Sequence, residues 1–123
     1  MDYQLVITPQ DGYLHVQVEG IGNYENAVAM WKQVIEACNT HGIYNILGEQ
    51  YLTRTLSTSE AFDYPRLFKE VGITHKYRIA WVDNNPRTRD ITEFIRDVLT
   101  SRFIGKGKLF KNVDDAKAWL LKK

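Results

Sequence analysis

The sequence predicts a single α/β domain: a mixed sheet of about five strands with four helices, in the order ββαβαβαβα. The clearest indication is residues 76–103. Lys76–Val82 is rich in β-branched and aromatic residues, as buried strands are. Apolar residues then recur at spacings of three and four, the pattern of one helix face: Ile91, Phe94, Ile95, Val98, Leu99 and Phe103. A strand that leads into a core-packed helix is the repeating unit of an α/β fold.

The chain opens on an expected antiparallel hairpin. Tyr3–Thr8 and Tyr13–Glu19 are rich in β-forming residues, and the Asp11-Gly12 pair between them suits a tight turn. Residues 24–41 then carry an apolar face with helical spacing, and Gly42 is a typical helix end. A long helix therefore follows the hairpin and covers the sheet.

The third strand is expected at Ile43–Gln50, and a helix crossover before it makes a parallel neighbour more favourable than a hairpin. Ser57 and Glu60 have the spacing of a capping box, which starts a helix. Pro65 would remove one hydrogen bond of that helix, so we expect either a kink or a new helix start at Asp63.

The C-terminal half has its own start signals. Asn85 can cap the helix after the central strand, and Pro86 fits the first helical position, where a missing N–H costs nothing. Gly105–Gly107 is expected to be a turn and Lys108–Lys111 the last strand, and Asn112 then caps a final helix.

Composition limits the class of protein. A chain of 123 residues, 44% hydrophobic, has room for one core, so residues 1–123 form one domain. The formal charge of +1 does not favour a nucleic-acid partner. The single cysteine, Cys38, excludes an internal disulfide, and neither a signal peptide nor an apolar run long enough for a bilayer is present, so we expect a cytoplasmic protein with no membrane span.

The loops after the third and central strands are the expected binding site, because ligands of open α/β sheets bind beyond the carboxyl ends of parallel strands. The candidate residues for a ligand or partner are Asn85, Arg87, Arg89, Arg54, Ser57 and Thr58. Arg87 and Arg89 place positive charge at the N-terminal end of the expected helix, which is itself partly positive and therefore repels them. An anion bound there would turn this repulsion into attraction. The alternative is that the two arginines form surface pairs with Asp90 and Glu93.

Other side chains have two interpretations each. Ser57 and Thr58 are possible phosphorylation sites, or simply part of a helix cap. Glu49 and Asp83 are a possible acid/base pair, or a solvated strand end and a turn former. The three histidines lack ligand spacing, so no metal and no cofactor is expected.

Four aromatic residues lie near predicted loops: Tyr24, Tyr51, Phe62 and Tyr64. They either edge an apolar groove between the first two helices or pack into the core. The groove would suit the acyl tail of an amphipathic ligand.

The sequence resembles the STAS-domain superfamily, in its SpoIIAA-like branch. The resemblance rests on Arg78–Asp83, Phe94–Val98 and Leu109–Leu121 and spans nearly the whole chain. The resemblance implies the SpoIIAA-like fold. It also implies a binding function, with another protein, a nucleotide or a lipid-like molecule as the partner. In the anti-sigma antagonists of this superfamily, a serine in an Asp-Ser-(Ser/Thr)-Gly motif is phosphorylated. Ser57 and Thr58 occupy a comparable place, but Leu56 stands where that motif has aspartate and Ser59 where it has glycine.

Three functions follow as hypotheses. The first is a non-enzymatic binding or regulatory module whose partner is another protein, with a homodimer also possible. The second is a carrier of a small anionic or amphipathic ligand. The third is a hydrolase or isomerase that uses Glu49 and Asp83.

Overall fold

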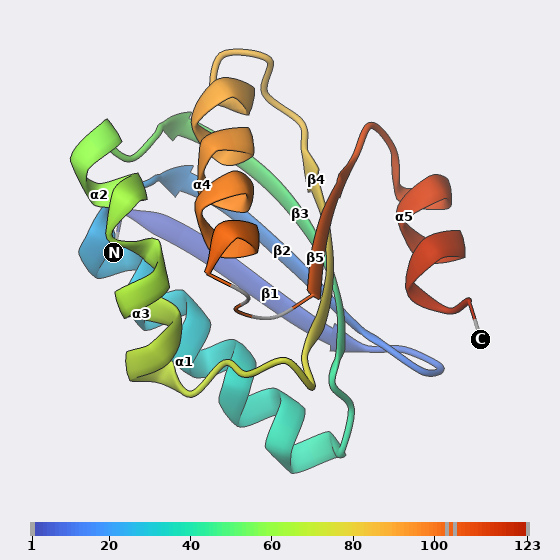
Figure 1. Cartoon of the computed structure of the whole chain (residues 1–123). Coiled ribbons are helices and arrows are strands. Elements are labelled where there is room, and N and C mark those ends of the chain that lie inside the picture. The colour runs from blue at the N-terminus through green and yellow to red at the C-terminus, as the bar shows by residue number, and fades with distance from the viewer. Residues whose placement is uncertain (1, 103, 105, 123) are drawn as a thin grey trace.

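The protein is described here by a computed structural model that covers residues 2–102, 104 and 106–122. Its five strands form one sheet in the order β1-β2-β3-β4-β5. The strands are β1 (Tyr3–Pro9), β2 (Leu14–Ile21), β3 (Asn45–Arg54), β4 (Arg78–Asp83) and β5 (Lys106–Phe110). β1 and β2 are antiparallel and every other neighbouring pair is parallel, which confirms the predicted mixed sheet (Figure 1).

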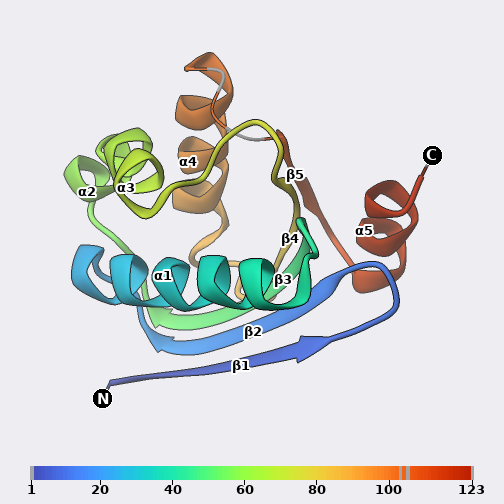
Figure 2. The ribbon, with the colours of Figure 1, turned by 90° about the horizontal axis from the view of Figure 1, so that it is seen from below.

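Five helices are described rather than the four expected: α1 (Tyr24–His41), α2 (Thr58–Phe62), α3 (Tyr64–Val71), α4 (Arg89–Ser101) and α5 (Val113–Leu120). The additional helix arises because the segment that contains Pro65 ends at Asp63 and starts again, as one of the two alternatives predicted. Pro65 lies in the first turn of α3, where no intrahelical bond from its nitrogen is needed. The first four helices cover one face of the sheet, and α5 lies apart from them, against β3, β4 and β5 (Figures 1 and 2).

β3 is longer than predicted and continues beyond Gln50 to Arg54. Leu52 is buried whereas its neighbours Tyr51 and Thr53 are exposed, which is the alternation of a strand with one covered face. Glu49 and Gln50 therefore lie within the sheet, and Arg54 is the last residue of the strand rather than a loop residue.

The start of α4 was predicted wrongly. The helix begins at Arg89, its N-cap is Thr88, and residues 86–88 form a turn. Asn85 does not cap the helix, because its Oδ1 accepts a hydrogen bond from the Arg87 N–H (3.0 Å) and its carbonyl accepts one from the Thr88 N–H (3.0 Å). Phe103, expected on this helix, and Gly105, expected in the next turn, lie outside the described residues.

The last strand begins at Lys106, two residues before the predicted start. The final helix has the predicted cap, since Asn112 Oδ1 accepts from the Asp115 N–H at 2.8 Å. Ala116 and Leu120 of this helix pack on Leu47 and Val82. These two residues cover β3 and β4 on the face of the sheet opposite to the first four helices.

The same face of β1 and β2 has none of the described helices over it (Figure 2). Val6 of β1 and Tyr51 of β3 are consequently exposed, by 54% and 53%. The main core lies on the opposite face, between the sheet and the first four helices.

Candidate functional site

The loop after β4 lies against the carboxyl-terminal part of β3. The Asn84 N–H donates to the Gln50 carbonyl (2.8 Å), and Asn85 Nδ2 donates to the Leu52 carbonyl (2.6 Å). α2, which lies in the connection after β3, also packs against α4, the helix that follows the β4 loop. We call the surface formed by Arg54, Ser57, Thr58, Asn85, Arg87 and Arg89 the rim.

The rim is positively charged. The side chains of Arg54, Arg87 and Arg89 are exposed. Among the described residues, no carboxylate oxygen lies within 4.0 Å of any of the three guanidinium groups, so the surface pairs with Asp90 and Glu93 do not form. Arg89 Nε donates to the carbonyl of Asp83 at 3.3 Å, which directs that side chain back along the loop.

A buried carboxylate holds the β4–α4 loop in place. Asp83 is 6% exposed, and its two oxygens accept from Thr88 Oγ1 at 2.8 and 2.7 Å. Further donors are Thr92 Oγ1 (2.7 Å), Gln50 Nε2 (3.1 Å) and the Asn85 N–H (3.0 Å). Neutral donors from β3, the loop and α4 thus surround this carboxylate, which explains why Thr88 rather than Asn85 precedes the helix.

The capping box at α2 is confirmed. Ser57 Oγ accepts from the Glu60 N–H (3.1 Å), and Glu60 Oε1 accepts from the Ser57 N–H (3.0 Å). Glu60 Oε2 also accepts from the Tyr24 N–H (2.8 Å), which joins the start of α2 to the start of α1. The N–H groups of Ser57 and Tyr24 lower the pKa of the Glu60 carboxyl from its ordinary value.

Glu49 and Asp83 do not form the carboxylate pair considered from the sequence. They point to opposite faces of the sheet, since Glu49 lies opposite Val82 on the α5 side and Asp83 bonds to α4. Glu49 Oε2 is instead 2.6 Å from Nε2 of His15 on β2. Sequence reasoning missed this contact because the two residues are 34 positions apart, although the alternation of β2 and a parallel β3 would have put them on one face.

The expected aromatic groove between the first two helices is not where the sequence put it. A cavity of about 110 Å³ lies instead between the sheet and α1, α3 and α4. Tyr64 lines it, but Phe62 is exposed and Tyr51 faces the other side of the sheet.

The cavity is mainly apolar. The rings of Trp31 and Trp81 lie 5.4 Å apart in its wall. Gln50 and Thr92, which bond to Asp83, also line it, as does Arg96 of α4. β3, β4 and α4 therefore contribute both to the cavity and to the network behind the rim.

No helix in residues 2–102, 104 and 106–122 combines the length and the apolar character that crossing a membrane requires. No family model matches the sequence, and no curated protein matches it either.

Two of the solved structures that resemble this chain match it over almost their whole length. The first is an uncharacterized protein of the DUF3478 family with a SpoIIAA-like fold, from Shewanella loihica; it has 21% identity and a TM-score of 0.55, and the match covers 96% of this chain and 93% of that one. The second is an anti-sigma factor antagonist from Mycobacterium paratuberculosis, with 16% identity, a TM-score of 0.66, and coverage of 98% and 95%. This chain has the SpoIIAA-like fold.

The SpoIIAA-like fold confirms the architecture that the STAS resemblance implied. At these identities the similarity concerns the fold. The SpoIIAA-like fold in this chain carries the rim at the carboxyl ends of β3 and β4 and the cavity between the sheet and its helices.

Proposed function

We propose that this protein is a non-enzymatic binding or regulatory module of the cytoplasm, and that the rim is its contact surface. The observation that carries the proposal is the 2.6 Å hydrogen bond from Asn85 Nδ2 to the Leu52 carbonyl, which fixes the loop after β4 to the carboxyl-terminal part of β3, two residues before Arg54. The buried bonds of Asp83 keep the second connection rigid, so a partner would meet a preformed surface.

The charge of the rim favours an acidic protein segment as the partner. Arg54, Arg87 and Arg89 are exposed, and guanidinium groups recognise carboxylates through two parallel hydrogen bonds. A protein of the same fold is named an anti-sigma factor antagonist, a name that describes action on another protein. This supports protein recognition as the general function of the module.

Ser57 and Thr58 are proposed as phosphorylation sites that would oppose this binding. Both side chains are exposed at the start of α2. A phosphate adds about two negative charges, which would offset most of the charge of the three arginines. The phosphorylated rim should therefore bind an acidic segment more weakly.

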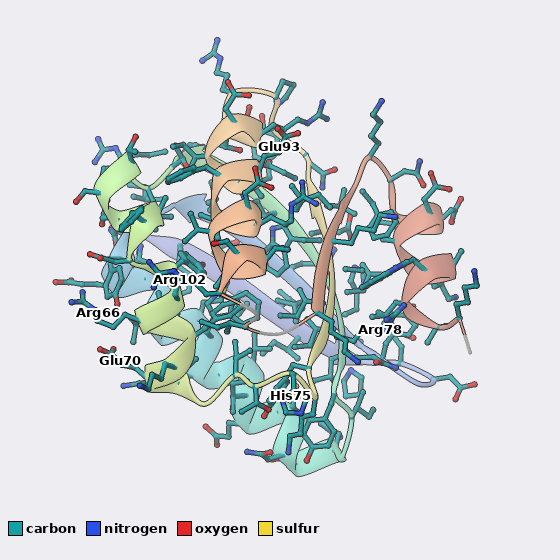
Figure 3. The ribbon with its side chains drawn as sticks, viewed as in Figure 1. Arg66, Glu70, His75, Arg78, Glu93 and Arg102 are labelled. Atoms are coloured by element: carbon teal, nitrogen blue, oxygen red, sulfur yellow. The ribbon has the colours of Figure 1, made fainter. Side chains whose placement is uncertain are left out.

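The test is a set of matched charge reversals in a pull-down from native cell extract. Arg87→Glu and Arg54→Glu should each weaken capture of a specific partner, and Ser57→Glu should weaken it in the same direction. The control is Arg102→Glu, which makes the same charge reversal at the C-terminal end of α4 (Figure 3), whereas the rim lies at its N-terminal end. Equal capture by all variants would rule the rim out as the contact surface.

A carrier of a small anionic or amphipathic ligand is the second candidate function. The cavity of about 110 Å³ beside Trp31 and Trp81 favours it, because ligand sites are concave and mostly apolar with a few polar groups. Native mass spectrometry of freshly purified protein should then detect a co-purified ligand. Empty protein that gains no thermal stability in a ligand screen would contradict a carrier function.

A further inference from the structure

The described charged residues that line the cavity are all basic. In the part of the chain that the structure describes, no aspartate, glutamate or histidine lines the cavity, whereas Arg96, Lys106 and Lys108 do. The alternation of β5 turns Lys106 and Lys108 to the α5 side, where Lys108 Nζ lies 5.5 Å from the centre of the Phe110 ring. Arg96 is therefore the cation whose side chain belongs to the α4 wall.

Arg96 has an unused donor. Its Nε is buried and has no hydrogen-bond partner among the described residues. Asp97 Oδ1 forms an ion pair with this nitrogen at 3.0 Å but lies outside hydrogen-bond geometry, and the side chains of Arg96 and Asp97 are 41% and 66% exposed. A buried N–H without a partner is unfavourable, and a guanidinium N–H is satisfied best by an anionic oxygen.

The cavity has an outer end between α4 and β5. Thr100 is exposed there, and Gly107 leaves the space open: a Cβ at this position would have Ile79 O, at 3.8 Å, as its nearest neighbour. Arg96 lies one helical turn before Thr100 on the same helix. A ligand with its polar group at this end would keep that group near solvent.

The size of the cavity limits the apolar part of a ligand. A cavity of about 150 Å³ lined by apolar side chains is known to hold benzene. The cavity here is smaller, at about 110 Å³, which limits the apolar part of a ligand to a short alkyl chain beside Trp31 and Trp81. A long acyl chain would not fit within it.

We propose that the cavity binds a small amphipathic carboxylate, with its apolar part against the two tryptophans and its carboxylate at Arg96. This inference rests on the second candidate function and names the ligand class and its orientation. It assigns to Arg96 a role that is separate from the arginines of the rim.

The test is calorimetric titration with hexanoate and with hexan-1-ol, which have the same chain but differ in charge. Hexanoate should bind at least about tenfold more tightly, the effect of a hydrogen bond to a charged group. Arg96→Met should remove this preference and leave the affinity for hexan-1-ol within about twofold, since it retains the apolar stem. Ala27→Leu, which adds carbon atoms inside the wall, should weaken both ligands.

The outcomes separate the two proposals. Equal affinity of the acid and the alcohol, or a preference that survives in Arg96→Met, would overturn the orientation but leave a carrier function standing. No binding of either compound would overturn both this inference and the carrier function, without effect on the rim. Circular dichroism of each variant, with Arg96→Lys as a charge-preserving control, would confirm that the fold is retained.

Discussion

Replacing Asp83 by alanine should be among the most destabilising single changes in the protein. The Thr88 and Thr92 hydroxyls would each keep a second acceptor, the carbonyls of Asn85 and Thr88, both at 3.1 Å. Gln50 Nε2 would keep Thr92 Oγ1 at 3.1 Å. The Asn85 N–H would lose the acceptor that holds its loop.

The expected cost follows from these losses. An orphaned donor costs about 1–3 kcal/mol, and each bond to a charged acceptor is worth more than one to a neutral acceptor. Because three donors find weaker partners and one finds none, we expect Asp83→Ala to lower the free energy of unfolding by about 3 kcal/mol. With a typical slope for a small domain, the midpoint of urea unfolding should fall by about 2 M.

Two variants control this measurement. Asp83→Asn retains one carbonyl oxygen and the side-chain shape, so it should lower the free energy of unfolding by about half as much as Asp83→Ala. Glu49→Ala removes a carboxylate from the opposite face, where it contacts His15 at a partly exposed site, and should cost about 1 kcal/mol or less. The reasoning is refuted if Asp83→Ala is no more destabilising than Glu49→Ala.

Three further predictions concern packing, capping and the thiol. Gly48→Ala would place a Cβ against the Trp81 ring, so overpacking should cost about 1–3 kcal/mol in urea unfolding, and an unchanged midpoint would contradict this packing. Backbone N–H groups lower the folded pKa of Glu60, so its contribution to stability is present above the ordinary value of 4.5 and is lost as the pH falls through the folded pKa; Glu60→Gln should flatten the acid limb of a stability profile, and parallel profiles would count against the cap. Burial raises the pKa of the Cys38 thiol to about 11, so a thiol reagent at about pH 8 should label only unfolded protein, and rapid labelling of the native state would disagree with that burial.

The sequence predicted the elements better than their ends. Glu49-Gln50 resembled a strand end because both side chains are polar, but Gln50 is buried and satisfied by Trp81 Nε1 at 2.9 Å and by Asp83. Asn85-Pro86 resembled a helix start, but the Thr88 hydroxyl donates to Asp83, whose carboxylate is also bonded to Gln50 of β3, and this buried network outweighs the capping signal. Both errors have the same cause, a buried polar network that joins residues distant in sequence.

The site was predictable to the extent that topology determines it. Parallel neighbours β3 and β4 bring their carboxyl ends together, so Arg54 and Asn85 were expected near one another. Which arginines lack acidic partners depends on side-chain positions, and spacing on the helix suggested pairs that do not form. His15 and Glu49 approach across two strands, a relation that requires the register of β2 and β3.

The absence of a side chain at Gly48 lets the Trp81 ring lie close against β3, where it forms part of the cavity wall together with Trp31. Indole emission depends strongly on whether the ring is next to water or hydrocarbon. Two of the three tryptophans of this protein therefore provide an internal optical reporter at the cavity. A compound that enters should change the intensity or wavelength of their fluorescence, so candidate ligands of any chemical class can be screened without attaching a label to them or to the protein.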